Sequence, residues 1–284
     1  MAGSAVGIIH PGAMGVSVAA AARNSGHTVY WASAGRSAAT RQRAEGAGLL
    51  DAGSLGDLCR LCSVVISVCP PHAAEEVAEQ VRAGGFRGLY LDANAISPMR
   101  VAAIGAAMTA ASIRFVDGGI VGGPAWEPGQ TWLYLSGQDA AELASLFAAG
   151  PLETTVLDGS IGRASALKMC YAAYTKGTTA LLAAILATSE EFGVRQALMV
   201  QWERDWPGFP AQAEGRAQRV TAKAWRFAGE MEEIAATFRQ AGLPGGFHGA
   251  AADLYRRLAH FKDEAALPPV AEVLAALLQR PGAG

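Results

Sequence analysis

A turn near the start of the sequence carries glycines at the spacing of a dinucleotide-binding motif. The pattern G-x-G-x-x-G runs from residue 10 to residue 15, except that His10 occupies the first glycine position while Gly12 and Gly15 keep the other two. The second glycine lets the backbone approach a pyrophosphate, and the third allows a helix to pack closely on a strand. An ordinary strand–helix turn, in which the glycines serve packing only, is the alternative interpretation. The motif predicts that the cofactor contacts His10, Pro11, Gly12, Ala13 and Met14.

Polar residues about 20 positions beyond this turn indicate which dinucleotide binds. An Asp or Glu about 20 residues past the glycines binds the ribose 2′-hydroxyl of NAD, and none is found there. Ser33, Arg36 and Ser37 instead offer two hydroxyls and a guanidinium, which suit a 2′-phosphate. The sequence therefore favours NADP(H) over NAD(H). A plain surface loop with a solvated arginine is the alternative.

These residues follow short apolar segments that predict strands. Residues 5–9 and 28–32 flank an alanine-rich helix at 14–23, which gives the strand–turn–helix–strand unit that binds a pyrophosphate at the helix N-terminus. Strands alternating with helices predict an α/β fold with a parallel, doubly wound sheet. Further strands are expected at 63–69, 89–92, 113–117 and 131–136, and further helices at 73–81, 99–111 and 140–148.

In such a sheet, the loops at the carboxyl ends of the strands form the ligand crevice. The loops after the third and fourth strands contain Cys69, Pro70, Pro71 and Asn94, which we expect beside the nicotinamide. The glycine-rich segment 118–124 follows the next strand and is expected to be a loop of the same crevice.

The sequence after residue 160 predicts helices only. Residues 163–192 contain no proline and have helical periodicity, so they form a helix roughly 45 Å long at 1.5 Å per residue. Residues 178–187 carry no charge, so this part should be buried on all sides. Helices follow at 195–205, 211–238 with a break, 247–262 and 270–279. We therefore predict a Rossmann domain over 1–160 and an all-helical domain over 161–284.

Composition excludes several other classes of protein. Of the 284 residues, 51% are hydrophobic and 17% are charged, which is typical of a well-buried globular enzyme. The net charge of −2 gives no support for nucleic-acid binding. Residues 177–189 form an uncharged run that is too short for a membrane span of about 20 residues. No signal peptide is expected.

The four cysteines, Cys59, Cys62, Cys69 and Cys170, are interpreted as small buried residues in a reducing compartment. Cys59 and Cys62 form one C-x-x-C pair without the second pair that a metal site needs. We therefore expect a cytoplasmic protein with no metal.

The sequence resembles the 6-phosphogluconate dehydrogenase/β-hydroxyacid dehydrogenase superfamily, which includes 3-hydroxyisobutyrate dehydrogenase-like proteins and imine reductases. The resemblance covers most of the chain. The rear half is similar to the little-characterised C-terminal domain of some of these dehydrogenases, marked by residues 168–169 and 174–177. The matching segments are 7–15 at the cofactor turn, 92–98 at a D-x-S-T-like turn near the nicotinamide, 117–123 at the substrate loop and 166–172 at the catalytic helix.

The resemblance implies that Lys168 is the general acid/base. A lysine partly desolvated in a cleft can have its pKa lowered and exchange a proton with a carbonyl or alcohol oxygen. The chain has 19 arginines but only four lysines, which favours a lysine that is needed because it titrates. Tyr171 and Thr175 share its helix face and can hold the substrate or relay the proton. An ordinary helix lysine and a packed tyrosine are the alternatives.

Three departures from the family pattern bear on the substrate. The family's substrate-loop serine is Val121 here, its asparagine three residues after the lysine is Tyr171, and its second lysine aligns with Gly229. These losses weaken the prediction of a simple 3-hydroxy acid. The remaining substrate-binding candidates are Val121, Gly122, Gly123, Thr175 and His248. For His248, the alternative is a histidine at a helix end that binds no ligand.

We therefore predict an NADPH-dependent oxidoreductase that interconverts a carbonyl and an alcohol, with Lys168 supplying the proton. One alternative is an NADPH-dependent imine reductase with Tyr171 as proton donor, and another is a non-catalytic NADP-binding protein. The sequence defines neither the substrate nor the physiological direction. The resemblance also implies a homodimer, in which each rear domain closes over its partner's cofactor crevice.

Overall fold

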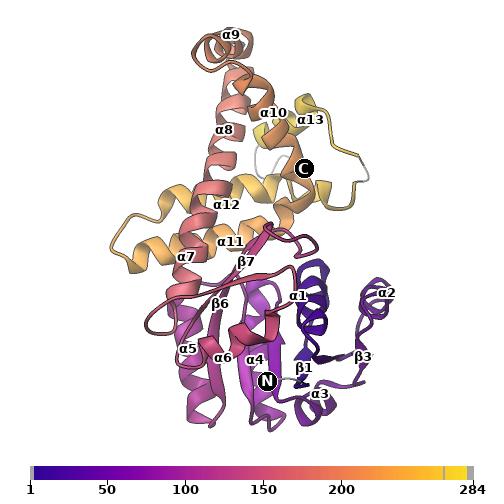
Figure 1. Cartoon of the computed structure of the whole chain (residues 1–284). Helices are drawn as coiled ribbons and strands as arrows, with labels where there is room; N and C mark the ends of the chain where they lie inside the picture. Colours follow the sequence, from indigo (N-terminus) through magenta and orange to yellow (C-terminus); the bar gives the residue numbers. More distant parts are fainter. Residues whose placement is uncertain (1–2, 265, 280–284) are drawn as a thin grey trace. The chain divides into compact units, whose positions relative to one another are not determined.

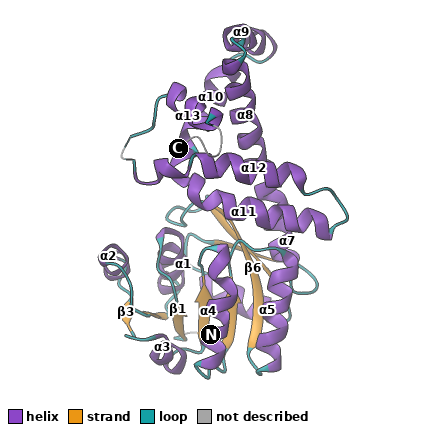
Figure 2. Cartoon of the chain, turned by 180° about the vertical axis from the view of Figure 1, so that it is seen from behind, coloured by secondary structure: helices purple, strands orange, loops and turns teal. Residues whose placement is uncertain are grey.

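The computed structural model describes residues 3–264 and 266–279 of the chain. The chain divides into two compact units, residues 1–169 and residues 170–284. Figure 1 follows the chain by colour, and Figure 2 shows that all strands of the described part belong to the first unit. The second unit contains helices and loops within its described residues. The predicted fold class is confirmed.

The first unit is built on one eight-stranded sheet. Its strands lie in the order β3-β2-β1-β4-β5-β6-β7-β8, and every neighbouring pair is parallel except β6 and β7. All six predicted strands are present, and β3 and β8 are additional. The strands are β1 (Ala5–Ile8), β2 (Thr28–Trp31), β3 (Leu50–Asp51), β4 (Val64–Ser67), β5 (Leu89–Asp92), β6 (Arg114–Gly122), β7 (Thr131–Ser136) and β8 (Glu153–Val156).

Helices cover both faces of this sheet and bury a core against each. Side chains from α1, α2 and α6 join one core, and side chains from α3, α4 and α5 join the other. In β4, Val64 and Ile66 enter the first core while Val65 enters the second, which explains the continuous apolar run of this strand. The helices are α1 (Ala13–Asn24), α2 (Ala38–Gly46), α3 (Leu55–Leu61), η1 (Pro71–Ala73), α4 (Ala74–Ala83), α5 (Pro98–Ala110), α6 (Ala140–Ala144) and η2 (Ser145–Phe147).

The prediction of a loop at residues 118–124 is wrong for most of that segment. Strand β6 continues to Gly122 and pairs antiparallel with β7. The glycines are there because neighbours come close: a Cβ on Gly118 would lie 2.8 Å from Leu91 Cδ1, and one on Gly119 would lie 2.5 Å from the Ala164 carbonyl oxygen. Composition alone therefore indicated a loop where the structure needs a tightly packed strand.

The long helix predicted at 163–192 is helical from Arg163 to Glu191 but is not uniform. A π-helical turn, η3 (Ala173–Gly177), separates α7 (Arg163–Ala172) from α8 (Thr178–Glu191). Helix α7 begins in the first unit and ends in the second. The later elements are α9 (Arg195–Asp205), α10 (Phe209–Arg219), α11 (Thr221–Gln240), α12 (Gly246–Arg257), η4 (Ala259–Asp263) and α13 (Val270–Leu278).

The uncharged part of α8 is not buried on all sides within one chain. Ala183 and Leu186 are buried, but 45% of the Leu181 surface is exposed. Helices α10, α12 and α13 pack against α8 and leave Leu181 exposed. The expectation of complete burial is therefore not met by a single chain.

The four cysteines are free and differ in exposure. Cys59 and Cys62 are buried as expected, and Cys69 is half-buried. Cys170 is exposed, so the prediction is wrong for this residue. Met169 and Ala172 form the buried side of α7, and Cys170 lies about 100° around the helix from Met169.

No helix among the described residues is both long and apolar enough to cross a bilayer. No group of His, Cys, Asp or Glu side chains in the same ranges is arranged to hold a metal ion.

Candidate active site

The sheet register brings the candidate loops to one edge. Ile8 of β1 pairs with Ile66 of β4, Ser67 of β4 pairs with Asp92 of β5, and Asp92 pairs with Asp117 of β6. These strands are parallel, so the loops that follow β1, β4 and β5 lie together at their carboxyl ends. Strand β6 extends past this edge.

The glycine turn leaves open space before the first helix. Gly12 is the N-cap of α1, and the described chain provides no side-chain hydrogen bond to cap it. A Cβ on Gly12 would meet no described atom within 4 Å, whereas one on Gly15 would lie 2.1 Å from the His10 carbonyl oxygen. Gly15 therefore serves helix–strand packing, and Gly12 leaves the free N–H groups of the helix N-terminus open to an anion.

His10 and Arg36 lie near this turn with buried polar atoms. Within the described residues, neither His10 Nδ1 nor Arg36 Nε has a hydrogen-bond partner. Burial, and then the charge of Arg36, lower the pKa of His10 to about 4, so its ring is neutral at pH 7. Arg36 also interacts electrostatically with Cys69. Buried donors without partners fit a bound phosphate-containing cofactor, because such groups are costly when left unpaired.

The two candidate serines are placed differently from each other. Ser33 is buried, and its interaction with the carboxylate of Asp51 in β3 lowers the pKa of that acid. Ser37 is exposed at the N-cap of α2, where its hydroxyl oxygen accepts from Thr40 N. The sequence did not indicate Asp51 because this acid comes from a two-residue edge strand that the pattern did not reveal. Arg36 and Ser37 remain the candidates for the 2′-phosphate.

A hollow of about 270 Å³ adjoins the first turn of α1. Its wall includes Arg43 of α2, whose Nε donates to the Pro11 carbonyl oxygen at 3.4 Å. Arg43 therefore supports the turn from behind. The hollow is lined by Ala13, Val16, Arg43, Gly46, Ala47, Pro124 and Trp126.

Asn94 holds the loop after β4. Its Oδ1 accepts from Cys69 N at 2.6 Å, and its Nδ2 donates to Ser67 Oγ at 3.1 Å. Asn94 is 2% exposed, so it acts on the cofactor crevice through the loop of Cys69, Pro70 and Pro71. Burial raises the pKa of the Cys69 thiol to about 11, so this cysteine is not an ionised nucleophile at neutral pH.

Asp92 is a fully buried carboxyl group beneath these loops. Its Oδ1 accepts from Asn94 N at 3.0 Å, while its Oδ2 has no partner among the described residues. Burial is the main cause that raises the pKa of Asp92 to about 7, and the nearby charge of Asp117 adds to it. The sequence marked Asp92 only as part of a turn and gave no sign of this ionisation.

Asp117 anchors the first turn of α7. Its Oδ2 accepts from Gly162 N at 2.9 Å and Ser165 N at 3.1 Å, and its Oδ1 accepts from Ser165 Oγ at 2.6 Å. Ser136 Oγ of β7 donates to the same Oδ2. A carboxylate at a helix N-terminus is favoured by the helix dipole. Asp117 with its partners Ser136, Gly162 and Ser165 forms a hub that fixes the helix carrying the candidate lysine.

Lys168 lies against β6, just beyond the carboxyl edge of β5. A Cβ built on Gly119 would be 3.1 Å from Lys168 Cβ. Gly119 lies two residues past Asp117, the partner of the last residue of β5. Lys168 is therefore at the edge that holds the cofactor loops. Gly122 and Gly123 are exposed beyond it, while Val121 is buried and contributes to packing.

The candidates in the second unit have distinct environments. Tyr171 is 48% exposed. Thr175 is half-buried and its Oγ1 donates to the Tyr171 carbonyl oxygen at 3.2 Å. His248 is 5% exposed, with its ring 4.3 Å from that of Phe238 and 5.1 Å from that of Phe247. Burial lowers the pKa of His248. Its Nδ1 has no hydrogen-bond partner among the described residues, so the substrate-binding role stays a prediction.

The fold and the site define a dinucleotide-binding protein with a Rossmann domain and a helical second unit. More narrowly, the chain belongs to the family of the NAD binding domain of 6-phosphogluconate dehydrogenase, whose model matches residues 5–146, half of the chain. A domain of unknown function (DUF1932) matches residues 190–258. The predicted family is thus confirmed, and its membership supports assignment to the NAD(P)-dependent oxidoreductases.

Individual relatives agree with this family. An uncharacterized 28.5 kDa protein of Methanothermus fervidus is 30% identical over 167 residues, which are 58% of this chain and 63% of that relative's length. The conserved protein MTH1747, of unknown function and described as structurally similar to 3-hydroxyacid dehydrogenases, is 27% identical. Its TM-score is 0.66, with 92% of this chain and 100% of that one covered. An imine reductase of Myxococcus stipitatus, in complex with NAD⁺, shares the fold at 19% identity and a TM-score of 0.54, with 96% and 99% covered.

Proposed function

We propose that this protein is an NADPH-dependent oxidoreductase that interconverts a carbonyl and an alcohol, with Lys168 as the general acid/base. One observation carries the proposal. The lysine is packed on Gly119 of β6, past the strand end where the open glycine turn and the Cys69 loop also lie. A proton donor and a dinucleotide site are the two parts that carbonyl reduction requires.

The residues of the crevice fit the cofactor. The uncapped N-terminus of α1 at Gly12 binds the pyrophosphate, and Arg36 with Ser37 binds the 2′-phosphate. The loop of Cys69 to Pro71, held by Asn94, borders the nicotinamide. When bound, the reduced cofactor supplies a hydride.

Lys168 moves the proton in the proposed reaction. Its ammonium donates a hydrogen bond to the substrate oxygen and transfers a proton as negative charge develops there. Gly122 and Gly123 border the substrate with bare backbone, and the phenol of Tyr171 contacts the reacting group. Asp117 keeps Lys168 in place through the first turn of α7.

Imine reduction is the second candidate, favoured by the exposed phenol of Tyr171. In that reaction Tyr171 is the proton donor and Lys168 is less important. A protein that binds NADP without turnover is the third candidate. The proposal also includes a homodimer with shared sites.

A panel of ketones, 3-hydroxy acids and cyclic imines, followed by NADPH absorbance, tests the proposal. Turnover of carbonyl substrates supports it, turnover of imines alone supports the second candidate, and tight NADPH binding without turnover supports the third. The panel also defines the substrate class, which the substitutions at Val121 and Gly229 leave open.

Cofactor choice is tested at Arg36. We expect NADPH to bind at least ten times more tightly than NADH, about 1.4 kcal/mol, because the guanidinium forms a charge-assisted bond with the 2′-phosphate. Arg36→Ala should remove this difference. Dissociation constants from titration calorimetry measure the difference between NADPH and NADH. Arg41→Ala is the control, because Arg41 Nη2 donates to the Ser33 carbonyl oxygen and is not assigned to the 2′-phosphate. Equal affinities in the wild type would exclude the NADP preference.

A further inference from the structure

Three threonine side chains bond to the backbone in and just after the π-helical turn η3. The hydroxyls of Thr175, Thr178 and Thr179 each donate to the carbonyl oxygen four residues earlier, at 3.2, 2.6 and 2.8 Å. Such bonds compete with the regular helix ladder for the same acceptors. A π-helical turn bonds five residues apart instead of four, so it accommodates one extra residue. Turns of this kind are rare and occur frequently at functional sites.

A guanidinium from α10 holds one side of this turn. Arg216 Nη2 donates to Thr178 Oγ1 at 2.6 Å, to Thr179 Oγ1 at 2.7 Å and to the Thr175 carbonyl oxygen at 3.3 Å. Arg216 is half-buried, so these bonds are shielded from water. The arginine thus stabilises the threonine hydroxyls in the positions that keep the turn wide.

Two more helices hold the other side. Tyr255 of α12 is buried and its hydroxyl donates to the Lys176 carbonyl oxygen at 2.7 Å. Lys176 Nζ forms an ion pair with Glu230 of α11 and lies 4.4 Å from the centroid of the Phe227 ring. The side chains of the pair are only 13% and 11% exposed. Three helices therefore fix a turn of five residues.

These contacts cost desolvation free energy that a purely structural turn would not require. Removing a lysine and a glutamate from water costs several kcal/mol per ion, and apolar replacements often stabilise a protein equally well. A continuous α-helix from α7 into α8 would need none of these contacts. Because so many contacts converge on η3, we infer that the geometry of this turn serves a function beyond stability.

Tyr171 is the residue whose place depends on that geometry. It lies two residues before η3, and its carbonyl oxygen accepts the first of the threonine bonds. Without the extra residue, a regular helix would rotate Tyr171 by about 100° relative to α8. We propose that the clamped π-turn positions the phenol of Tyr171, and that Tyr255, Arg216 and the Lys176–Glu230 pair are positioning residues acting through the turn. This inference rests on the proposed function, in which Tyr171 contacts the reacting group.

Tyr255→Phe is the sharpest test because it removes one hydroxyl and keeps the buried ring. We expect kcat to fall about tenfold, with the KM for NADPH unchanged, because small misplacements of a contacting group slow the reaction. In a Tyr171→Phe background the same substitution should have no further effect, since residues that act as one unit are non-additive. Tyr30→Phe in β2 is the matched control and should leave kcat unchanged.

Several results would overturn the inference. A Tyr255→Phe variant with normal kcat, or an equal loss in both backgrounds, would show that Tyr255 does not act through Tyr171. Normal kcat in Tyr171→Phe would remove the phenol from the reaction while leaving Lys168 and the proposed oxidoreductase intact.

A readout that does not depend on activity separates this inference from the proposed function. With 3-fluorotyrosine incorporated, the ¹⁹F signal assigned to Tyr171 should shift in Tyr255→Phe while the signal of Tyr30 stays fixed. An unmoved Tyr171 signal would overturn the inference even in an active enzyme. A shifted signal in a protein that turns over no substrate would support the positioning device and reject the proposed function.

Discussion

Lys168 is the residue whose removal tests the proposed chemistry most directly. Lys168→Ala should lower kcat by roughly a hundredfold or more, the usual contribution of a positioned general acid. The affinity for NADPH should hardly change, because the pyrophosphate binds at Gly12. Stopped-flow hydride transfer and fluorescence titration of NADPH measure the two quantities.

The control for this variant should be Lys223→Ala, because Lys223 is exposed on α11. Lys176 would be a poor control, since its ammonium is paired with Glu230 and buried. Near-normal turnover in Lys168→Ala together with an inactive Tyr171→Phe would replace carbonyl reduction by the imine reductase mechanism.

Asp92 should make the protein less stable as pH rises. Its pKa is about 7 in the folded chain and 3.8 ordinarily, so the folded state keeps a proton that the unfolded state loses. The contribution of the protonated carboxyl group to the free energy of unfolding is fully present below pH 3.8 and is lost as pH rises through 7. The loss reaches about 4 kcal/mol at pH 8. Asn cannot ionise, so Asp92→Asn should lack this loss.

Thermal unfolding at pH 5 and pH 8 measures the effect. The Tm of Asp92→Asn minus the Tm of the wild type should be larger at pH 8 than at pH 5, whatever its value at pH 5. Parallel pH curves would mean that the carboxyl group is ionised in the folded state at neutral pH.

At the scale of elements, the packing of α7 on β6 positions the lysine. Gly119→Ala should destabilise the fold by about 1–3 kcal/mol, because the new methyl group meets the Ala164 carbonyl oxygen at 2.5 Å and α7 must move. The same movement should lower kcat. Denaturant unfolding and turnover assays measure both effects.

Gly249→Ala in α12 is the matched control, since its Cβ would meet no described atom within 4 Å. An alanine there should be neutral or stabilising by about 0.5–1 kcal/mol. If Gly119→Ala were as stable and active as this control, the close packing of α7 on β6 would not be what positions Lys168.

Elements with a strong local pattern were predictable from the sequence. Strands β5 and β7 and helix α9 match their predicted bounds, and the two strands do so because apolar runs define them locally. Strand β3 has two exposed residues and β8 has little apolar periodicity, so neither has a local signal. The π-turn was not predicted either: its threonines are local in sequence, but Arg216 and Tyr255, which also bond to it, are distant.

The candidate site was partly predictable for the same reason. The glycine turn is a local motif, and the structure gives Gly12 and Gly15 different surroundings, open at Gly12 and tightly packed at Gly15. The interaction of Ser33 with Asp51, the burial of His248 and the anchoring of α7 by Asp117 all join segments far apart in sequence. Residue type alone suggested ligand binding at Ser33 and His248, and only the structure shows that His248 packs between aromatic rings and that Ser33 interacts with Asp51.

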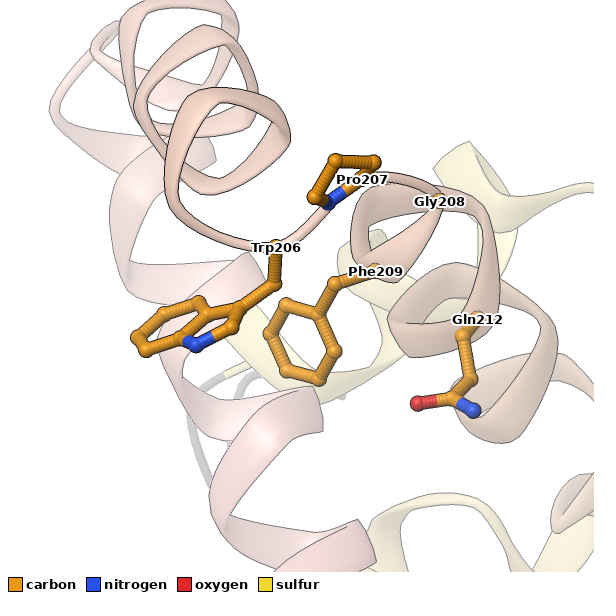
Figure 3. Close-up of a pocket in the computed structure, with 5 residues that line it drawn as sticks. All are labelled: Trp206, Pro207, Gly208, Phe209 and Gln212. Atoms are coloured by element: carbon orange, nitrogen blue, oxygen red, sulfur yellow. The ribbon is translucent and has the colours of Figure 1, made fainter.

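At the scale of the whole molecule, we predict an obligate homodimer with shared sites. The helical unit exposes large apolar side chains in the first turn of α8 (Leu181), between α8 and α9 (Phe192 and Val194) and in α9 (Val200). A pocket of about 570 Å³ lies at the turn from α9 to α10, where the rings of Trp206 and Phe209 are 5.7 Å apart (Figure 3). A second copy that covered these surfaces should bury more than about 2,000 Å².

Two measurements test the dimer. Light scattering should give a dimer over a wide dilution range. Activity per chain should fall on dilution in parallel with dissociation of the dimer, because a site shared between two chains is complete only in the dimer. A compact and active monomer at nanomolar concentration would contradict the arrangement.

The hub at Asp117 limits how the protein can be dissected. Three of its four bonds come from Gly162 and Ser165, which lie beyond residue 160. A fragment that stops at residue 160 would bury this carboxylate with Ser136 as its one remaining donor among these partners, at a cost of several kcal/mol. A nucleotide-binding fragment should therefore fold by itself only when it retains the first turn of α7. In gene fusion or recombination, the same constraint makes that helical turn an inseparable part of the Rossmann module.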